Sequence, residues 1–135
     1  MNPPRYVLDT NIISALLRME SQVANRFADA LVTEAKLYLC PMVFYEIYRG
    51  LLHRDAKGQL NTFLGYVSTL HWDDVTKEDW RAAGEHWAKL RLRGYQMADN
   101  DLLIAVFALQ RQAILVTDNE KHFEALGVPM QNWRR

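Results

Sequence analysis

The stretch Tyr6-Val7-Leu8-Asp9-Thr10-Asn11 decides the fold of this chain. A short apolar run ends here in an acid, a hydroxyl and an amide, and a segment with helical apolar spacing follows at once. Asp, Thr and Asn cap helices well because their side chains accept hydrogen bonds from the free amides of a first turn. We therefore predict a buried strand over 5–8, a helix just after it, and Asp9 at the carboxyl end of the first and central strand. Open α/β sheets gather their functional groups at such strand ends.

The segments beyond this stretch alternate between compact apolar runs and helical periodicity. The compact runs predict further strands over 37–40 and 114–117, with short strands over 69–72 and 128–130. Strands that alternate with helices indicate an α/β fold, with a parallel sheet and helices on both of its faces.

Capping and helix-breaking residues set the predicted helix boundaries. Ser21 is expected to cap the second helix and Pro41 to open the third, because a missing amide costs little in a first turn. Thr76 followed by Asp79 has the form of a capping box, which starts a long helix that ends near Gly94. The other predicted helices run through Leu60 to Val67, through the almost wholly apolar Leu102 to Leu109, and through Phe123 to a stop at Gly127.

Composition limits the class of protein. A chain of 135 residues predicts one domain, and a hydrophobic content of 50% excludes a disordered chain. The formal net charge is zero, so any nucleic-acid binding must rest on a local patch. The single cysteine, Cys40, has no partner for an intramolecular disulfide and fits a reducing interior. Without a recognisable signal peptide or an apolar run of membrane-spanning length, the expected compartment is the cytoplasm.

Several acids and amides occupy similar places, where a predicted strand ends or a predicted helix begins. Glu46 differs, because it lies one turn into the helix that Pro41 opens, among apolar neighbours where an unpaired charge is costly. Carboxylates that share a cleft repel one another and need protons or a divalent metal, and oxygen ligands suit magnesium or manganese. The set comprises Asp9, Glu46, Asp99, Asp101, Asp118 and Asn119.

Other interpretations of these residues are open. Asp9 and Asp99 can be simple helix caps, and Glu46 can be a solvated acid on a helix face. The four histidines lack zinc-type spacing, and the chain has neither a glycine-rich phosphate loop nor a serine-hydrolase elbow.

Four motifs carry a resemblance to a known family. They are Leu-Asp-Thr-Asn at 8–11, Glu46 in the helix after the second strand, Asp-Leu-Leu-Ile-Ala at 101–105, and Val-Thr-Asp-Asn at 116–119 with Phe123 beyond. In this order they resemble the PIN domain, and more closely the VapC toxins of bacterial type II toxin–antitoxin pairs. The motifs extend from residue 6 to residue 123, so the resemblance covers almost the whole chain.

The resemblance implies a fold, an activity and a site. The fold is a single PIN-like domain over 1–135, a three-layer sandwich with a central, mostly parallel sheet of about five strands flanked by helices. The activity is that of an endoribonuclease that depends on Mg²⁺, for which Mn²⁺ can substitute. Asp9 and Asp101 match the principal metal-binding acids and Glu46 the third acid. The fourth family position holds Asn119, so either the neighbouring Asp118 supplies the missing charge or the site works with three acids.

Supporting residues complete this picture. Thr10 and Asn11 are expected to hold the Asp9 loop, and Asn11 can also orient a water, whereas Asp99 is either an additional ligand or a cap. By the same resemblance the protein is a homodimer neutralised by a VapB-like antitoxin. Such antitoxins cover an apolar groove near the active site. Groove candidates, each of which can equally be core, are Leu16, Leu17, Phe44 and Tyr48.

The hypothesis for the chemistry is cleavage of single-stranded or loop RNA, transfer RNA included, by a metal-activated water that leaves a 5′-phosphate and a 3′-hydroxyl. Glu46, or Asp118 through a water, accepts the proton. Arg91 and Arg93 are candidates for gripping phosphates, although basic residues near a helix end are also common dipole partners. Trp80 and Trp87, two helical turns apart, are assigned to the core.

Two rival functions remain at this point. A phosphatase or phosphotransferase with Asp9 as its nucleophile would resemble the haloacid dehalogenases, but these require a second Asp where this chain has Asn11. A non-catalytic interaction module on a PIN-like fold is the other rival, and Asn119 is the residue that favours it.

Overall fold

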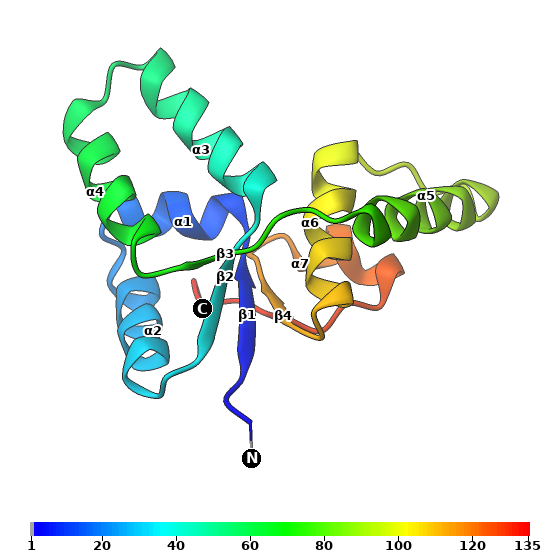
Figure 1. Cartoon of the computed structure of the whole chain (residues 1–135), viewed down its shortest axis with the longest axis horizontal. Coiled ribbons are helices and arrows are strands. Elements are labelled where there is room, and N and C mark those ends of the chain that lie inside the picture. Colours follow the sequence, from blue (N-terminus) through cyan, green and yellow to red (C-terminus); the bar gives the residue numbers. More distant parts are fainter. Residues whose placement is uncertain (1) are drawn as a thin grey trace.

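Strand β1 (Arg5–Leu8) is the central strand of a five-stranded sheet with the order β3-β2-β1-β4-β5 (Figure 1). The computed structural model describes residues 2–135. Every strand pairing is parallel, so the sheet is wholly rather than mostly parallel. The other strands are β2 (Lys36–Leu39), β3 (His71–Trp72), β4 (Ile114–Val116) and β5 (Met130–Gln131).

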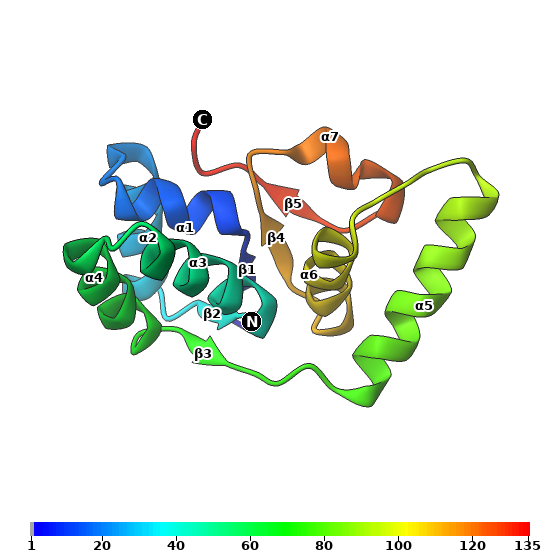
Figure 2. The ribbon, with the colours of Figure 1, turned by 90° about the horizontal axis from the view of Figure 1, so that it is seen from above.

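Helices cover both faces of this sheet, which gives the predicted three layers (Figure 2). Four helices gather on one side: α1 (Thr10–Leu17), α2 (Ser21–Val32), α3 (Pro41–His53) and α4 (Lys57–Val67). On the other side lie α5 (Lys77–Leu92), α6 (Asp99–Gln110) and α7 (Glu120–Phe123), which continues as a 3₁₀ turn over Glu124–Leu126.

The strand order places a topological switch point between β1 and β4. The chain leaves β1 toward α1 on one face, whereas it leaves β4 toward α7 on the side of α6 (Figure 1). The two strand ends are joined by the amide of Asp9, which donates to the carbonyl oxygen of Val116 at 2.9 Å. In open α/β sheets such a point leaves a crevice beyond the carboxyl ends of the strands, and that is where ligands bind.

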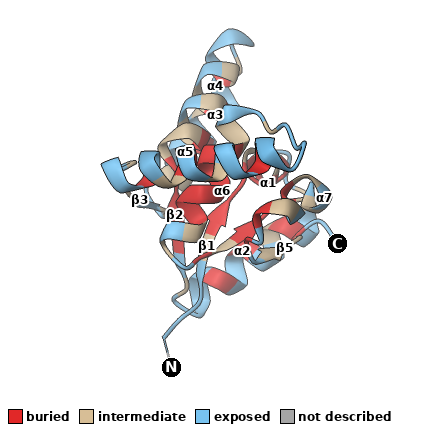
Figure 3. Ribbon diagram, turned by 90° about the vertical axis from the view of Figure 1, so that its right-hand side faces the viewer, coloured by how far each residue is buried: buried red, intermediate tan, exposed pale blue. Residues whose placement is uncertain are grey.

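Helix α6 fills the space between the sheet and α5, as its apolar sequence predicts. Residues 102–108 are all buried, and Figure 3 shows this helix in the buried colour behind α5. A helix that is apolar on all sides must be covered on all sides. This buried helix carries Asp101 in its first turn, where the side chain lines the cleft at the switch point.

The C-terminal segment also contributes to the core. Trp133 is almost fully buried, and its ring meets that of Tyr6 edge-on with the centroids 5.2 Å apart.

Cys40 is buried and free, as expected, and burial raises the pKa of its thiol to about 11. No helix in residues 2–135 combines the length and the apolar character needed to cross a membrane.

The predicted cap Ser21 is wrong, and the alternative assignment of Asp99 as a helix cap fails in the same way. Ser21 and Asp99 are the first residues of their helices, and the cap positions are held by Glu20 and Ala98 with extended backbone. A polar first residue cannot cap its own helix, because the capping side chain must come from the residue before it. Glu20 makes no cap hydrogen bond either, since its carboxylate binds two arginines instead.

The assignment of Trp80 and Trp87 to the core is wrong. Their exposed fractions are 57% and 41%. Helix α5 packs against α6, and its buried residues are confined to Asp79, Ala83 and Leu90. The two tryptophans flank this narrow stripe and, with α6, border an apolar pocket of about 450 Å³.

Candidate active site

A cleft of about 340 Å³ opens at the switch point and collects most of the predicted site residues. The loop after β1 and helix α1 supply five residues, α3 supplies Glu46, α6 supplies Asp101, and the loop after β4 supplies Asn119. Four segments that are distant in sequence therefore meet here. The lining residues are Asp9, Thr10, Asn11, Ser14, Arg18, Glu46, Asp101 and Asn119.

Asp9 is buried at the base of this cleft and has two roles. It is the N-cap of α1, where its Oδ1 accepts from the amide of Thr10 at 2.8 Å, and its Oδ2 accepts from Oγ1 of Thr117 at 2.9 Å. Burial raises the pKa of Asp9 to about 6 in spite of these hydrogen bonds, and the negative charges of Asp101 and Glu46 add to the increase. The site therefore favours a proton or a cation beside this carboxylate.

The other two acids are held by polar neighbours. Oε1 of Glu46 accepts from Oγ1 of Thr10 at 3.1 Å, and its Oε2 accepts from Nδ2 of Asn100 at 2.8 Å. Oδ2 of Asp101 lies 3.0 Å from Nε2 of His122. Each carboxylate is thus oriented before any ligand arrives.

The three carboxylates share the cleft without meeting at one point. In the described part of the chain, no group of three or more His, Cys, Asp or Glu residues is already placed to hold a metal ion. Magnesium commonly binds one or two carboxylates directly and keeps several waters, so a compact triad of ligands is not required.

Asn11 provides an independent sign that the cleft is suited to a cation. Its Oδ1 is the one buried side-chain oxygen or nitrogen in residues 2–135 without a hydrogen-bond partner. An unpaired buried acceptor is costly and needs an explanation. Asn11 lines the cleft beside Asp9, so a hydrated cation would supply the missing donor through one of its waters. The donor set of carboxylate and amide oxygens fits such an ion.

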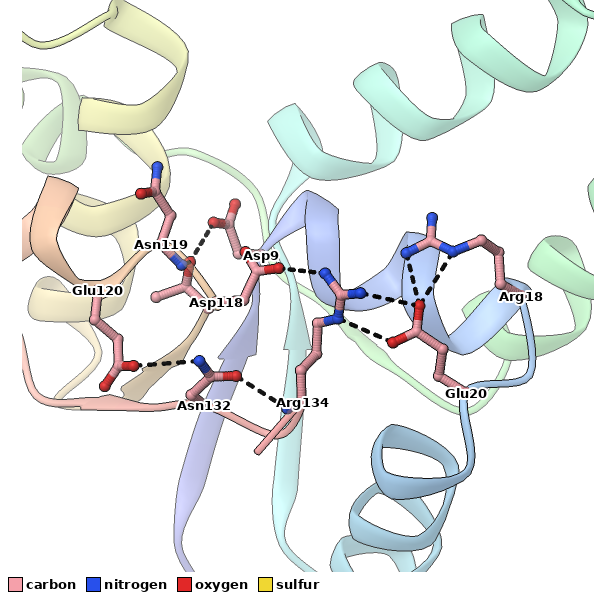
Figure 4. Close-up of polar contacts among 9 residues, drawn as sticks. Asp9, Arg18, Glu20, Asp118, Asn119, Glu120, Asn132 and Arg134 are labelled. Carbon is pink, nitrogen blue, oxygen red and sulfur yellow. Dashed lines mark hydrogen bonds and ion pairs between the residues drawn. The ribbon is translucent and has the colours of Figure 1, made fainter.

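The structure separates the candidates for the fourth position. Asn119 lines the cleft, whereas Asp118 does not and pairs with Nη1 of Arg134 at 2.5 Å (Figure 4). The amide of Asn119 donates to Oγ1 of Thr117 at 3.1 Å, which ties the loop to the hydroxyl that also serves Asp9. Asp99 lies outside the cleft, in the apolar pocket between α5 and α6.

The proposed phosphate-gripping residues, Arg91 and Arg93, also lie outside the cleft lining. The Arg91 guanidinium lies 4.6 Å from the ring centroid of Trp87. Arg93 lies 5.1 Å from the ring of Tyr95, and its Nη1 donates to the carbonyl oxygen of Ala125 at 3.3 Å.

Four residues at or beside the cleft were not found from the sequence as parts of the site. Thr117 binds Asp9, Asn100 binds Glu46, and His122 binds Asp101. The position of Asn100 between two acids of the set is a signal in the sequence, whereas His122 belongs to no zinc-type spacing and to none of the four motifs. Arg18 lines the cleft from the C-terminal end of α1, and no motif marks it.

Comparison with known proteins agrees with the geometry. The PIN domain family model matches residues 6–128. Ribonuclease VapC2 of Rickettsia felis is 28% identical, covering 95% of this chain and 97% of the relative. The tRNA(fMet)-specific endonuclease VapC of Shigella flexneri is 30% identical, covering 91% and 92%.

Solved structures have the same fold over nearly their full length. VapBC2 from Rickettsia felis, bound to a DNA fragment from its promoter, superposes with a TM-score of 0.86 at 27% identity, covering 96% of this chain and 98% of the other. DNA-bound VapBC from Salmonella typhimurium gives a TM-score of 0.85 at 23% identity, with the same coverage.

The chain has a wholly parallel sheet of order 3-2-1-4-5 with acids at its switch point, which is the architecture of an α/β protein with an acidic site at the strand ends. Because the PIN domain model matches residues 6–128, the chain belongs to the PIN-domain family. Its place within that family is among the VapC proteins, as the relatives from Shigella flexneri and Rickettsia felis indicate.

Proposed function

We propose that this chain is the toxin of a type II toxin–antitoxin pair and acts as a metal-dependent endoribonuclease on single-stranded or loop RNA, transfer RNA included. The observation that carries the proposal is the cleft at the switch point, where Asp9, Glu46 and Asp101 face one space in a chain of the VapC group. The relatives named as a ribonuclease and an endonuclease support this activity.

Mg²⁺ is the proposed cofactor, with Mn²⁺ as a substitute. Asp9, Asp101 and Glu46 would hold it, and the raised pKa of Asp9 and the unpaired Oδ1 of Asn11 are the features that fit a cation. When bound, such an ion supplies positive charge that makes water more acidic and offsets the charge of the phosphate.

The side chains themselves would carry the remaining steps. Glu46 is the better candidate to accept the proton of the attacking water, because Asp118 is engaged with Arg134 outside the cleft lining. Thr10 and Asn100 keep the carboxylate of Glu46 oriented for this task. Attack by water would leave a 5′-phosphate and a 3′-hydroxyl, so a 2′,3′-cyclic phosphate among the products would contradict this chemistry.

A VapB-like antitoxin is the proposed partner, and the similarity to the two solved VapBC structures supports it. A groove of about 420 Å³ between α1 and α3 shares Thr10, Arg18 and Glu46 with the cleft, so an occupant of the groove would also obstruct the cleft. Of the four groove candidates, only Leu17 lines it. Leu16 is buried, and Phe44 stacks on Tyr48 at 5.2 Å. A homodimer of single-domain chains in the cytoplasm completes the proposal.

The test is cleavage of a mixed small-RNA pool by antitoxin-free protein with Mg²⁺, with Mn²⁺ and with chelator. Asp9→Asn and Asp101→Asn are prepared by the same purification and serve as matched variants. Metal-dependent cutting that both variants lose supports the proposal, and the fragment ends then identify the target. Cutting that survives in both variants points to a contaminant or another site and contradicts it.

A non-catalytic interaction module remains the second candidate, because the fourth position is Asn119 and the acids do not form a compact triad. Titration with Mn²⁺ separates the two functions. An enzyme requires tighter binding to the wild type than to Asp9→Asn, whereas a module that has lost its metal site gives the same curve for both proteins.

A further inference from the structure

Three charged side chains form a linked set at the edge of the cleft (Figure 4). Oε2 of Glu20 accepts from Nε of Arg18 at 3.1 Å and from its Nη2 at 2.8 Å. From the opposite side, Nε of Arg134 donates to Oε1 of Glu20 at 2.9 Å and Nη2 donates to Oε2 at 3.2 Å. The carboxylate of Glu20 is therefore clasped between two guanidinium groups.

Arg18 and Arg134 differ in how many of their guanidinium nitrogens make hydrogen bonds. Arg134 uses its third nitrogen, Nη1, to hold Asp118, so its fork is fully engaged. Within residues 2–135, Nη1 of Arg18 makes no hydrogen bond, and Arg18 is the only basic residue among those that line the acidic cleft. A polyanion that enters this cleft meets three carboxylates and this one cation.

We propose that Arg18 binds a phosphate of the RNA strand next to the phosphate that is cleaved, and that Glu20 occupies its guanidinium group until RNA arrives. This inference rests on the proposed ribonuclease function. Arg134 has a positioning role, because it holds Glu20 beside Arg18 while it keeps Asp118 out of the cleft lining.

The geometry favours exchange of a carboxylate for a phosphate. Both groups present paired oxygens to the planar guanidinium fork, and arginine suits such recognition. The side chains of Arg18 and Glu20 have exposed fractions of 51% and 31%, and exposed ion pairs are weak, so breaking this pair costs little. The chain has no net charge and its cleft is acidic, so Arg18 is the cation that it can present to RNA. The ion pair with Glu20 keeps Arg18 from attracting other anions strongly.

The experiment measures RNA binding and its salt dependence. The parent protein is full-length, antitoxin-free Asp9→Asn, titrated with a fluorescently labelled single-stranded RNA at fixed Mg²⁺ and varied monovalent salt. Each phosphate contact to a single strand contributes about 0.7 to the slope of log affinity against log salt. Adding Arg18→Gln to the parent should reduce this slope by about 0.7 and weaken binding. The control Arg81→Gln changes the net charge equally at an exposed site on α5 and should leave the slope unchanged.

A double-mutant cycle tests the role of Glu20. Glu20→Gln should tighten RNA binding by roughly two- to fivefold, the range that loss of an exposed competing ion pair allows. In the presence of Arg18→Gln this gain should disappear. In protein with native Asp9, Arg18→Gln should raise KM and leave kcat nearly unchanged, because the contacted phosphate does not react.

The outcomes separate this inference from the function on which it rests. If the wild type cleaves RNA and Arg18→Gln has the same binding slope as Arg81→Gln, Arg18 is not a phosphate-binding residue and only this inference is overturned. A gain from Glu20→Gln that persists without Arg18 likewise overturns it. If the wild type does not cleave RNA and the parent does not bind it, the proposed function fails as well.

Discussion

Asp9 must serve two conflicting requirements. As the N-cap of α1 it is buried beside the first turn, and as the proposed metal ligand it would have to be charged. Burial raises its pKa to about 6, so the ionised form is costly in the metal-free fold. A residue that destabilises the fold in the state required for function is typical of an active site.

Asp9→Asn should stabilise the metal-free protein at neutral pH. Folded Asp9 holds its proton up to about pH 6, whereas the unfolded carboxyl loses it near the ordinary pKa of 3.8. Folding thus takes up a proton in this window, and the free energy of unfolding falls as pH rises through it. The difference of about two pKa units corresponds to roughly 3 kcal/mol at most, present above pH 6 and absent below pH 4.

Urea unfolding in chelator at several pH values measures this effect. The advantage of Asp9→Asn should grow between about pH 4 and pH 6 and then stay constant. An equal difference between the two proteins at every pH would show that Asp9 is not the group whose ionisation costs stability.

His122 should act on metal affinity through Asp101. Nε2 of His122 lies 3.0 Å from Oδ2 of Asp101, so His122 orients the carboxylate that we propose as a metal ligand. Removing such an outer partner typically costs about 10- to 100-fold in metal affinity. His122→Ala should therefore shift the Mg²⁺ dependence of cleavage to higher concentration, with the rate recovered at saturation. His53→Ala, at an exposed site on α3, is the control, and equal shifts in both variants would refute the role.

Residues that belong to a motif could be predicted from the sequence as parts of the site, and residues without a motif could not. Asp9 follows the first predicted strand, Glu46 lies one turn into a predicted helix, and Asp101 lies at the start of another, so the sequence predicts that these three acids share one cleft. Arg18 is an ordinary helix-end arginine in the sequence. Its position beside the cleft depends on the turn between α1 and α2, where its guanidinium group donates to the carboxylate of Glu20.

The start of α5 depends on a local contact that the sequence predicts and on a distant contact that it does not. The capping box between Thr76 and Asp79 was predicted from sequence and is present. Asp79 is also buried, and Nη1 and Nη2 of Arg111 donate to its two oxygens at 3.0 and 2.9 Å. Burial would raise the pKa of Asp79, but the hydrogen bonds from Arg111 and Thr76 outweigh it and leave the pKa below its ordinary value. No local pattern could have indicated a partner 32 residues away.

Asp79→Ala should destabilise the protein strongly. It leaves the nearly buried Arg111 without its principal partner, and breaking a buried ion pair typically costs about 3–5 kcal/mol. The matched control is Asp73→Ala, which removes the other carboxylate bound to Arg111 at a site that is 42% exposed. This control should cost about 1 kcal/mol or less. Urea midpoints compare the two, and similar losses would mean that burial does not decide the strength of these pairs.

At the scale of the whole molecule, the parallel sheet was predictable and the covering of α5 was not. Strands buried on both faces read as compact apolar runs, so the sheet is visible in the sequence. Whether an apolar side of a helix is covered depends on which elements pack against it, and α5 meets α6 along one narrow stripe. Trp80 and Trp87 were misplaced for this reason.

Mg²⁺ should stabilise the whole fold, because the metal-free cleft holds carboxylates that repel one another. A ligand that binds only the folded state at ten times its Kd contributes about 1.4 kcal/mol, or about 5 °C in Tm for a chain of this length. Thermal unfolding near pH 7.5 with Mg²⁺ and with chelator measures the effect. Asp101→Asn should lose most of the increase, and an undiminished increase in that variant would place the ion elsewhere.

The burial of Trp133 also makes the protein its own optical probe. The structure places Trp72, Trp80 and Trp87 at the surface and Trp133 against Tyr6 in the core. Dissolved quenchers such as iodide would therefore extinguish the fluorescence of three indoles and spare the fourth. Replacing the three exposed tryptophans with phenylalanine would leave a single emitter next to Arg134. The emission wavelength and fluorescence lifetime of Trp133 would report whether the C-terminal segment remains packed against the first strand during unfolding.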